Sequence, residues 1–328
     1  MNAKTKKIIK YALSFAVAVA LMYFCFKGVK WEDFWDGLKD CRWGWVVASI
    51  LIGLASNWFR SERWRQILLP IDGETTHITV FNAVNIGYIA NFVFPRIGEF
   101  VRCGVISKNS KKSTYDKVVG TVVTERSFDM LVLIVLLFLF LVIKWNEFGD
   151  FFRDKIWTPM AESMNINIWW VLALCIICFA AIIFVIFKYS DSSPILAKVS
   201  GVFKGLWTGI VSCFRMKGRS QALFHLHTIL LWVSYFLMSY TIMRAVPAVD
   251  YLSWVDALFL MLVGSIGWVV PVPGGFGAFH YIVALAVETV YGLPFSLGIV
   301  FATLSHESQS IMMVVTGLFS YVYEAVKK

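Results

Sequence analysis

The stretch Asn91-Phe92-Val93-Phe94-Pro95-Arg96-Ile97-Gly98-Glu99-Phe100-Val101-Arg102 decides how the chain folds. A proline and a glycine interrupt an apolar segment here, and Arg96, Glu99 and Arg102 recur at every third position. This spacing predicts that the three charges lie roughly along one side of a short helix. Ionisable groups in apolar segments are energetically expensive and usually face a protein interior or a watery cavity. The alternative is that they cap helix ends at a membrane surface, or pair in a structural ion network.

A second charged group follows on the next segment, with Glu125, Arg126 and Asp129 leading into the apolar run Met130–Ile143. Glu125 and Asp129 are four residues apart and would share a helix face, where two carboxylates repel unless a cation lies between them. Together with the first group, three positive and three negative charges can neutralise one another. We therefore expect Arg102, Glu125, Arg126 and Asp129 to line a common cavity.

The composition indicates an all-α integral membrane protein. Of 328 residues, 59% are hydrophobic and only 16% are charged, and the mean hydropathy is +0.70; soluble chains are usually near half apolar and a quarter charged. The net charge of +9 is interpreted as an orientation signal and not as a nucleic-acid surface, because the basic residues lie in short loops beside apolar segments. We expect both termini and the basic loops to be cytoplasmic, namely 60–76, 103–117 and 188–221.

Six segments are long enough to cross a membrane. They are Ile8–Phe26, Trp43–Phe59, the helix ending at Ile143, Ile168–Phe187, Ala222–Met243 and Pro294–Val326. The tryptophans that bracket the second one resemble an interfacial aromatic belt: Trp43, Trp45, Trp58 and Trp64. Two further segments, 77–107 and 253–291, are broken by proline and glycine. Full crossings there would place basic loops outside, so we predict two re-entrant helix pairs; eight crossings is the competing count.

The order of these segments predicts an inverted repeat within a single transmembrane domain. Residues 1–164 and 165–328 each read as span, span, broken pair, span, and an odd number of crossings inverts the second half relative to the first. Broken segments at matching places in two inverted halves point to a transport site near the midplane. Pro95–Gly98 and Pro273–Gly277 are therefore expected to meet there from opposite faces of the membrane.

The chemistry of the predicted site favours a phosphorylated lipid headgroup. Arginine offers a planar fork that suits phosphate and carboxylate. Half-helix N-termini after Pro95 and at Gly274-Gly275 add positive dipole ends and backbone N–H groups. The expected partner is a membrane lipid with an anionic or phosphate headgroup, with no nucleic acid; an oligomer is possible.

The histidines His280 and His306 offer a second kind of chemistry. His280 follows the Gly-Gly-Phe-Gly turn, and His306 precedes Glu307 in the last span. Two imidazoles and a carboxylate could bind a metal or relay protons. Their spacing is unlike that of zinc motifs, so polar contacts inside the bundle are expected, with no metal and no cofactor. No nucleotide-binding or catalytic motif is found, so an enzyme is the less expected class.

These motifs resemble those of the lysylphosphatidylglycerol synthase transmembrane, or flippase-like, family. The matching residues are Asn91, Pro95, Gly98, Glu99 and Arg102, then Glu125, Arg126 and Asp129, then Pro271, Pro273, Gly274, Gly275 and Gly277. The family's arginine before the glycine stands one place early here, at Arg96. The resemblance implies a multi-pass protein of a bacterial or archaeal cytoplasmic membrane, related to the lipid-translocating half of aminoacyl-phosphatidylglycerol synthases.

Two departures from the family pattern concern the site. Where the family often has Glu after the Gly-Gly turn this chain has His280, and His306 stands near a position that is often Arg. The soluble aminoacyl-transferase domain has no counterpart in this sequence, so lysyl transfer is not expected. The leading hypothesis is a lipid flippase or transporter; the alternatives are a membrane-embedded lipid-modifying transferase, with Glu125 and Asp129 as bases or Mg²⁺ ligands, and a regulatory membrane partner. The candidate substrate-binding residues are Asn91, Arg96, Glu99, Arg102, Glu125, Arg126, Asp129, Gly274, Gly275, His280 and His306.

Overall fold

The computed structural model describes residues 31–145 and 194–327, except 111, 217 and 271, together with isolated positions in 16–27 and 170–188. All regular secondary structure in this part of the chain is helical, as the composition predicts. The expected spans Ile8–Phe26 and Ile168–Phe187 lie almost wholly outside the described residues.

Ten α-helices are described, together with two short 3₁₀ turns in the connections between helices. They are α2 (Trp31–Lys39), α3 (Trp43–Leu68), α4 (His77–Val93), α5 (Gly98–Asn109), α6 (Tyr115–Ile143), α10 (Pro194–Arg215), α11 (Gly218–Ala245), η3 (Pro247–Val249), α12 (Trp254–Val269), η4 (Pro273–Gly275), α13 (Ala278–Tyr291) and α14 (Phe295–Val326). The chain forms two compact units: unit 1 is Met1–Val122 with Met216–Lys328, and unit 2 is Val123–Arg215.

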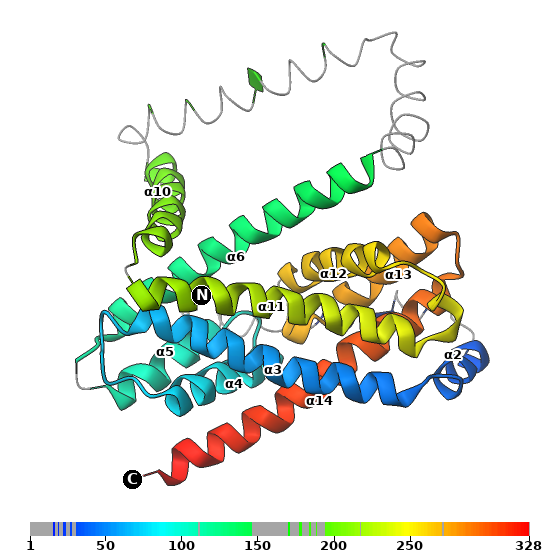
Figure 1. Ribbon diagram of the computed structural model, residues 1–328, viewed down its shortest axis with the longest axis horizontal. Helices are drawn as coiled ribbons and strands as arrows, with labels where there is room; N and C mark the ends of the chain where they lie inside the picture. Colours follow the sequence, from blue (N-terminus) through cyan, green and yellow to red (C-terminus); the bar gives the residue numbers. More distant parts are fainter. Residues whose placement is uncertain are drawn as a thin grey trace. The chain divides into compact units, whose positions relative to one another are not determined.

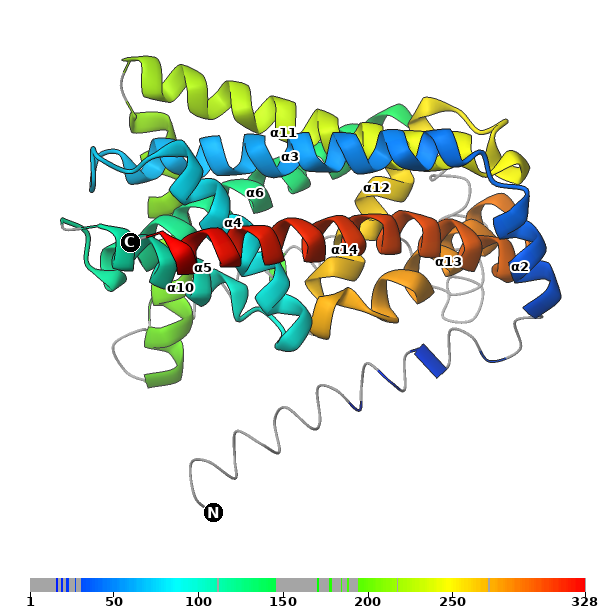
Figure 2. The same cartoon turned by 90° about the horizontal axis from the view of Figure 1, so that it is seen from below.

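Three long helices and two helical hairpins build unit 1 (Figure 1). Helices α3 and α11 lie side by side and antiparallel, since Arg42 before α3 donates its backbone N–H to Ala245 at the end of α11 (2.9 Å). The hairpin α4–α5 follows the end of α3, and the hairpin α12–α13 follows the end of α11. The two hairpins therefore enter the bundle from opposite ends, and Figure 2 shows both returning toward the end from which they came, beside α14.

Each hairpin has its own apolar core. Around α4–α5 the core is formed by residues of α3 to α6: Trp64, Leu68, Val80, Ala83, Val84, Cys103, Ile106, Val118 and Val122. Around α12–α13 the core draws on α2, α3 and α11 to α14, with Phe34, Ile242, Leu260, Val283, Ile299 and Phe301 among its members. Many of the buried polar side chains lie on α3, α4 and α14.

Close glycine contacts allow the hairpin arms to pack. A Cβ added to Gly98 would lie 2.0 Å from the carbonyl oxygen of Gly87, so α4 and α5 touch backbone to backbone. The side chain of Asn91 accepts the Gly98 N–H at 2.7 Å and so satisfies a donor at the start of α5. On the second hairpin, Gly264 and Gly267 give room to Phe279 in the same way.

The span predicted at Trp43–Phe59 is shorter than the helix that the structure shows. Helix α3 continues past Phe59 to Leu68, so Arg60 and Arg63 belong to the helix and are buried (6% and 0% exposed). Trp64 is wrongly assigned to an interfacial belt, because it is fully buried, whereas Trp43, Trp45 and Trp58 are exposed. The preceding loop also contains a helix, α2, that the sequence analysis did not predict.

Two of the described helices, α6 and α11, are long and apolar enough to cross a membrane. Their apolar windows are largely exposed and not packed inside the protein, unlike the core helix of a soluble domain. Helices α3 and α14 have 26 and 32 residues, long enough for a span, but they carry the buried polar side chains of the bundle.

Unit 2 contains α10 and the part of α6 after Val122. Gly209 of α10 lies against Thr124 and Ser127 of α6, where an added Cβ would meet the Thr124 Cα at 3.1 Å. The rings of Phe128 and Phe214 pack with centroids 5.6 Å apart. Helix α10 begins at Pro194, within the stretch 188–221 that is predicted as a basic loop.

Salt bridges join the start of α3 to the end of α11, outside the apolar region. Asp250 accepts hydrogen bonds from Arg244 (2.6 Å) and Arg42 (2.7 Å). These two guanidinium groups, Arg244 first, lower the pKa of the Asp250 carboxyl below its ordinary value. The carboxylate is therefore favoured in the folded state.

We expect Asp250→Asn to lower the melting temperature of the purified protein at neutral pH. Because the folded pKa is depressed, the stabilisation is present above the unfolded pKa of about 3.9 and is lost as the pH falls below it. The wild type and the variant should thus converge in acid. Asp36→Asn is the control, since its pair with Lys39 is highly exposed (67% and 73%) and should contribute little. A constant difference at all pH values would contradict this origin.

Candidate functional site

The tips of the two hairpins are in contact. The guanidinium of Arg96 donates to the carbonyl oxygen of Val269. The ring of Phe92 packs edge-on against Phe276 at 5.9 Å, and Gly274 leaves no room for a Cβ beside Phe92. The predicted meeting of the two Pro/Gly turns is therefore confirmed as a contact within unit 1; their depth in a membrane stays a prediction.

A polar layer crosses the middle of unit 1, between the two apolar cores. Asn57 of α3 donates to the Asn85 side chain of α4 at 3.0 Å. Gln309 of α14 donates to the Ser49 hydroxyl at 3.1 Å, and its side chain lies where a Cβ on Gly53 would be. All five of these residues are buried. These hydrogen bonds link α3 to α4 and to α14, although the buried side-chain oxygen of Gln309 accepts no hydrogen bond from the described residues.

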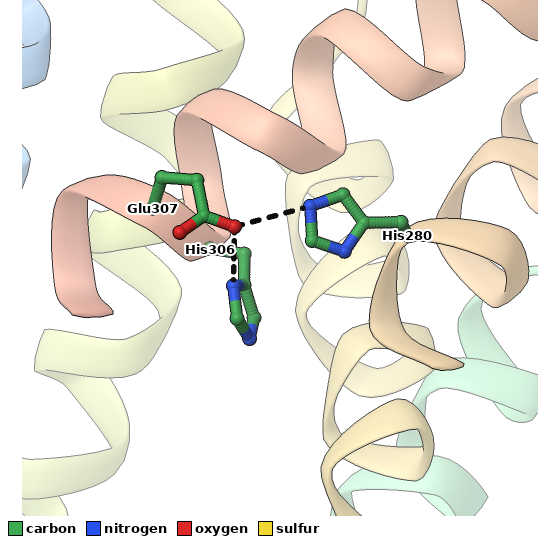
Figure 3. Close-up of side chains that lie close together, drawn as sticks. All are labelled: His280, His306 and Glu307. Atoms are coloured by element: carbon green, nitrogen blue, oxygen red, sulfur yellow. Dashed lines mark hydrogen bonds and ion pairs between the residues drawn. The ribbon is translucent and has the colours of Figure 1, made fainter. Parts of the chain in front are cut away.

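His280 and His306 meet at the acid Glu307 in this layer (Figure 3). His306 Nδ1 lies 3.0 Å from Glu307 Oε1, and His280 Nε2 lies 3.4 Å from the same oxygen. The other nitrogen of His306, Nε2, contacts the carbonyl oxygen of Gly274 at 2.8 Å. Both imidazoles are about 1% exposed, whereas the Glu307 side chain is 34% exposed.

The Gly-Gly turn serves this cluster through its carbonyl group. Gly274 and Gly275 both have positive φ (58° and 75°), a backbone conformation that favours glycine. Trp268 stacks on His306 with centroids 4.9 Å apart, and a Cβ on Gly275 would lie 3.1 Å from the Trp268 ring. The turn thus presents an acceptor to His306, where the sequence analysis expected backbone donors for an anion.

The three charges of the opening stretch do not share one helix side. Arg96 precedes α5 and has a positive φ of 58°, so it lies outside the helix, and its side chain is exposed. Glu99 is in the first turn of α5 and is half-buried. Arg102 is buried, with its guanidinium 4.4 Å from the centroid of the Trp64 ring. The proline break, not the helical spacing, decides where Arg96 points.

Glu125, Arg126 and Asp129 lie on α6 within unit 2. Glu125 is fully buried, Asp129 is half-buried and Arg126 is exposed. Each of the three has an interaction partner. That they line one cavity with Arg102 of unit 1 stays a prediction.

Sequence reasoning missed a buried charged segment on α3. Arg60 donates to the Tyr235 hydroxyl of α11 at 2.9 Å, and Glu62 lies 2.5 Å from His77 Nδ1 at the start of α4. Arg63 is the largest charged side chain with no exposed surface among the described residues. The sequence predicts that the span ends before these charges, at Phe59. Their spacing within one unbroken helical run, with Glu62 between two arginines, could have indicated a buried continuation.

A model of the family described as "Lysylphosphatidylglycerol synthase TM region" matches residues 11–317. The chain belongs to this family. The match spans nearly the whole sequence and confirms the resemblance carried by the Pro/Gly and charged motifs. The comparisons with curated proteins and with solved structures give no match.

Membership in this family makes the chain a multi-pass membrane protein related to lipid modification or transport. The largely exposed apolar windows of α6 and α11 agree with a lipid environment. The number of full crossings, the inverted repeat and the halves 1–164 and 165–328 stay predictions. The polar layer of unit 1 is then an interior feature of a membrane bundle.

Proposed function

We propose that the protein moves an anionic or phosphate-linked lipid between the leaflets of a bacterial or archaeal cytoplasmic membrane. The observation that carries the proposal is the polar layer of unit 1, at the place where hairpins from opposite ends of the bundle meet. Unpaired backbone and buried polar groups are costly in hydrocarbon, so membrane proteins retain them where they line a path or a site.

The two hairpins would give a lipid headgroup access from either side of the membrane. In the proposal both are re-entrant pairs, one opening from the cytoplasm and one from outside, and six helices cross fully. The contact between their tips involves one guanidinium–carbonyl bond, one aromatic pair and close glycine packing. A small separation of the tips would open the layer to a headgroup while the acyl chains stay in the bilayer.

The proposed headgroup follows from the arginines. Arg96 is exposed at the hairpin tip. Its planar guanidinium suits an anionic phosphate headgroup better than a zwitterionic headgroup, in which the choline cation offsets the phosphate charge. The basic loops predict that both termini are cytoplasmic. Entry of the headgroup at Arg96 would exchange a neutral carbonyl partner, Val269, for an anionic one.

The proposal predicts that purified protein in vesicles accelerates lipid movement. Vesicles containing head-labelled phosphatidylglycerol, a polyprenyl phosphate or phosphatidylcholine would be exposed to a membrane-impermeant quencher. We expect the anionic or phosphate-linked lipid to equilibrate between leaflets faster than in protein-free vesicles. The zwitterionic lipid should change least and serves as the matched control for leakage.

Two other outcomes decide between the alternatives. A labelled lipid recovered with altered mass would favour the lipid-modifying transferase. Leaflet distributions equal to those of protein-free vesicles, for every lipid tested, would contradict translocation and leave the regulatory membrane partner. The recovered protein should be monodisperse in each case, so that a loss of folding is not mistaken for a negative result.

A further inference from the structure

The His280–His306–Glu307 cluster has the arrangement of a metal site. It combines two imidazoles and one carboxylate, and their ligand atoms all lie within 4.8 Å of one another. The three residues come from two helices, α13 and α14, so the fold and not a local motif brings them together. Adjacent residues on a helix diverge by about 100°. The Glu307 side chain nevertheless folds back so that its carboxylate lies between the two rings (Figure 3).

The hydrogen bonding of His306 favours a positive charge next to its Nδ1 atom. The Gly274 carbonyl can only accept, so His306 Nε2 carries a proton (2.8 Å). In a neutral imidazole Nδ1 then presents a lone pair, and it faces the Glu307 carboxylate, another acceptor, at 3.0 Å. The Ser310 hydroxyl lies 3.3 Å from Nδ1 and can donate to its lone pair, but the carboxylate still faces that nitrogen with no proton between them. A cation between Nδ1 and the carboxylate resolves this conflict.

We propose that His280 Nε2, His306 Nδ1 and the Glu307 carboxylate bind a zinc-class divalent transition metal. Bonds of about 2.0–2.1 Å in tetrahedral geometry place ligand atoms about 3.3 Å apart, close to the 3.0 Å and 3.4 Å that separate the Glu307 oxygen from the two imidazole nitrogens. All three ligand atoms lie within 4.8 Å of one another. Two imidazoles with one carboxylate select zinc and its neighbours over Mg²⁺ or Ca²⁺, which prefer oxygen ligands.

The surroundings of His306 match those of known metal-binding histidines. Such residues usually donate their second ring N–H to a carbonyl or carboxylate, which fixes the tautomer and the ring orientation. Gly274 fulfils this role, and Trp268 and Phe276 hold the ring with centroids 4.9 Å from it on two sides. The positive φ of Gly274 and Gly275 is thereby explained as the geometry that aims a carbonyl at His306.

The cluster also has an open side. Both imidazoles are buried, but the Glu307 side chain is 34% exposed, so an ion can enter past the carboxylate and retain a water or an anion as its fourth ligand. The proposal departs from the sequence-based expectation of no metal, which rested on the spacing of the histidines alone. It goes beyond lipid translocation and does not depend on it.

Cobalt binding by the full-length protein tests the proposal. The protein is purified with a tag that contains no histidine, stripped with a chelator and titrated with Co²⁺, whose visible absorption reports tetrahedral coordination. We expect one Co²⁺ per chain, displaced by Zn²⁺. His306→Gln and Glu307→Gln should each weaken binding by more than the about 10- to 100-fold that loss of an outer contact costs.

The control is His227→Gln, which changes a histidine outside the cluster whose Nδ1 contacts the Leu223 carbonyl at 2.7 Å. It should bind Co²⁺ like the wild type. Zinc should also raise the melting temperature of the wild type and the control but not that of Glu307→Gln, a variant that keeps the side-chain shape. Absence of cobalt binding by the wild type, or equal binding by His306→Gln, would overturn the proposal and leave an imidazolium–carboxylate pair.

Discussion

Replacing Gly98 by alanine is expected to destabilise the protein severely. The new Cβ would lie 2.0 Å from the carbonyl oxygen of Gly87 and 2.8 Å from the Asn91 side-chain oxygen. The first neighbour is backbone, so α4 and α5 must separate, and the Asn91 hydrogen bond to the Gly98 N–H is lost with them. Overpacking of this kind costs about 3 kcal/mol. Thermal unfolding of purified protein in detergent measures the loss, together with the yield in the membrane.

Gly104→Ala is the matched control, because it lies on the same helix and a Cβ there meets nothing within 4 Å. It should be neutral or stabilising by about 0.5–1 kcal/mol, since alanine is the better helix former. Gly87→Ala, with a Cβ 2.9 Å from the Gly98 carbonyl oxygen, should act in the same direction as Gly98→Ala. Equal stability of the Gly98 and Gly104 variants would show that the hairpin is not packed as described.

The hairpins could be predicted from sequence because their determinants are local. Proline and glycine interrupt apolar runs at both tips, and the predicted broken segment 253–291 is confirmed as α12 and α13, which ends at Tyr291. The interruption predicted at Pro95 is confirmed as well, with α4 ending at Val93. Such signals depend on backbone geometry that only a few residue types allow.

The C-terminal end of α3 could not be predicted in the same way, although the predicted ends of α6 at Ile143 and of α14 at Val326 are confirmed. A run of charges after an apolar segment normally marks the membrane surface, but in α3 tertiary contacts override this, and Arg60 is buried against Tyr235. The partner is 175 positions away in the sequence. The spacing of the charges in α3 can indicate that the helix continues past Phe59, but it does not identify this partner.

The residues of the site could be predicted from the sequence, but the contacts between them could not. Both His280 and His306 were singled out, yet their junction at Glu307 depends on how α13 packs on α14. Arg96 was placed on a helix because its spacing to Glu99 is helical, whereas the backbone at Arg96 is left-handed. Residue spacing predicts which side chains share a helix face only when the first residue of the helix is known, and α5 begins at Gly98.

Arg126→Ala is expected to abolish lipid translocation while leaving the fold nearly intact, an expectation that rests on the proposed function. Arg126 is exposed on α6, and exposed substitutions usually change the free energy of unfolding by no more than about 0.5 kcal/mol. A guanidinium at the surface of a membrane helix can meet a phosphate directly, and alanine removes that attraction. The measurements are the leaflet-exchange rate per folded protein and the melting temperature.

Arg102→Ala provides the contrast, because this arginine is 4% exposed and stacks on the buried Trp64 ring at 4.4 Å. Its loss removes a desolvated cation–π contact of about 2 kcal/mol and leaves a void, so the melting temperature should fall. Arg102→Lys keeps the charge and should recover part of the stability. If Arg126→Ala instead exchanged lipid at the wild-type rate with unchanged stability, Arg126 would have no role at the headgroup. The selection of lipid would then have to come from the guanidinium that is exposed at the hairpin tip, Arg96, where a headgroup must displace the Val269 carbonyl before it can bind.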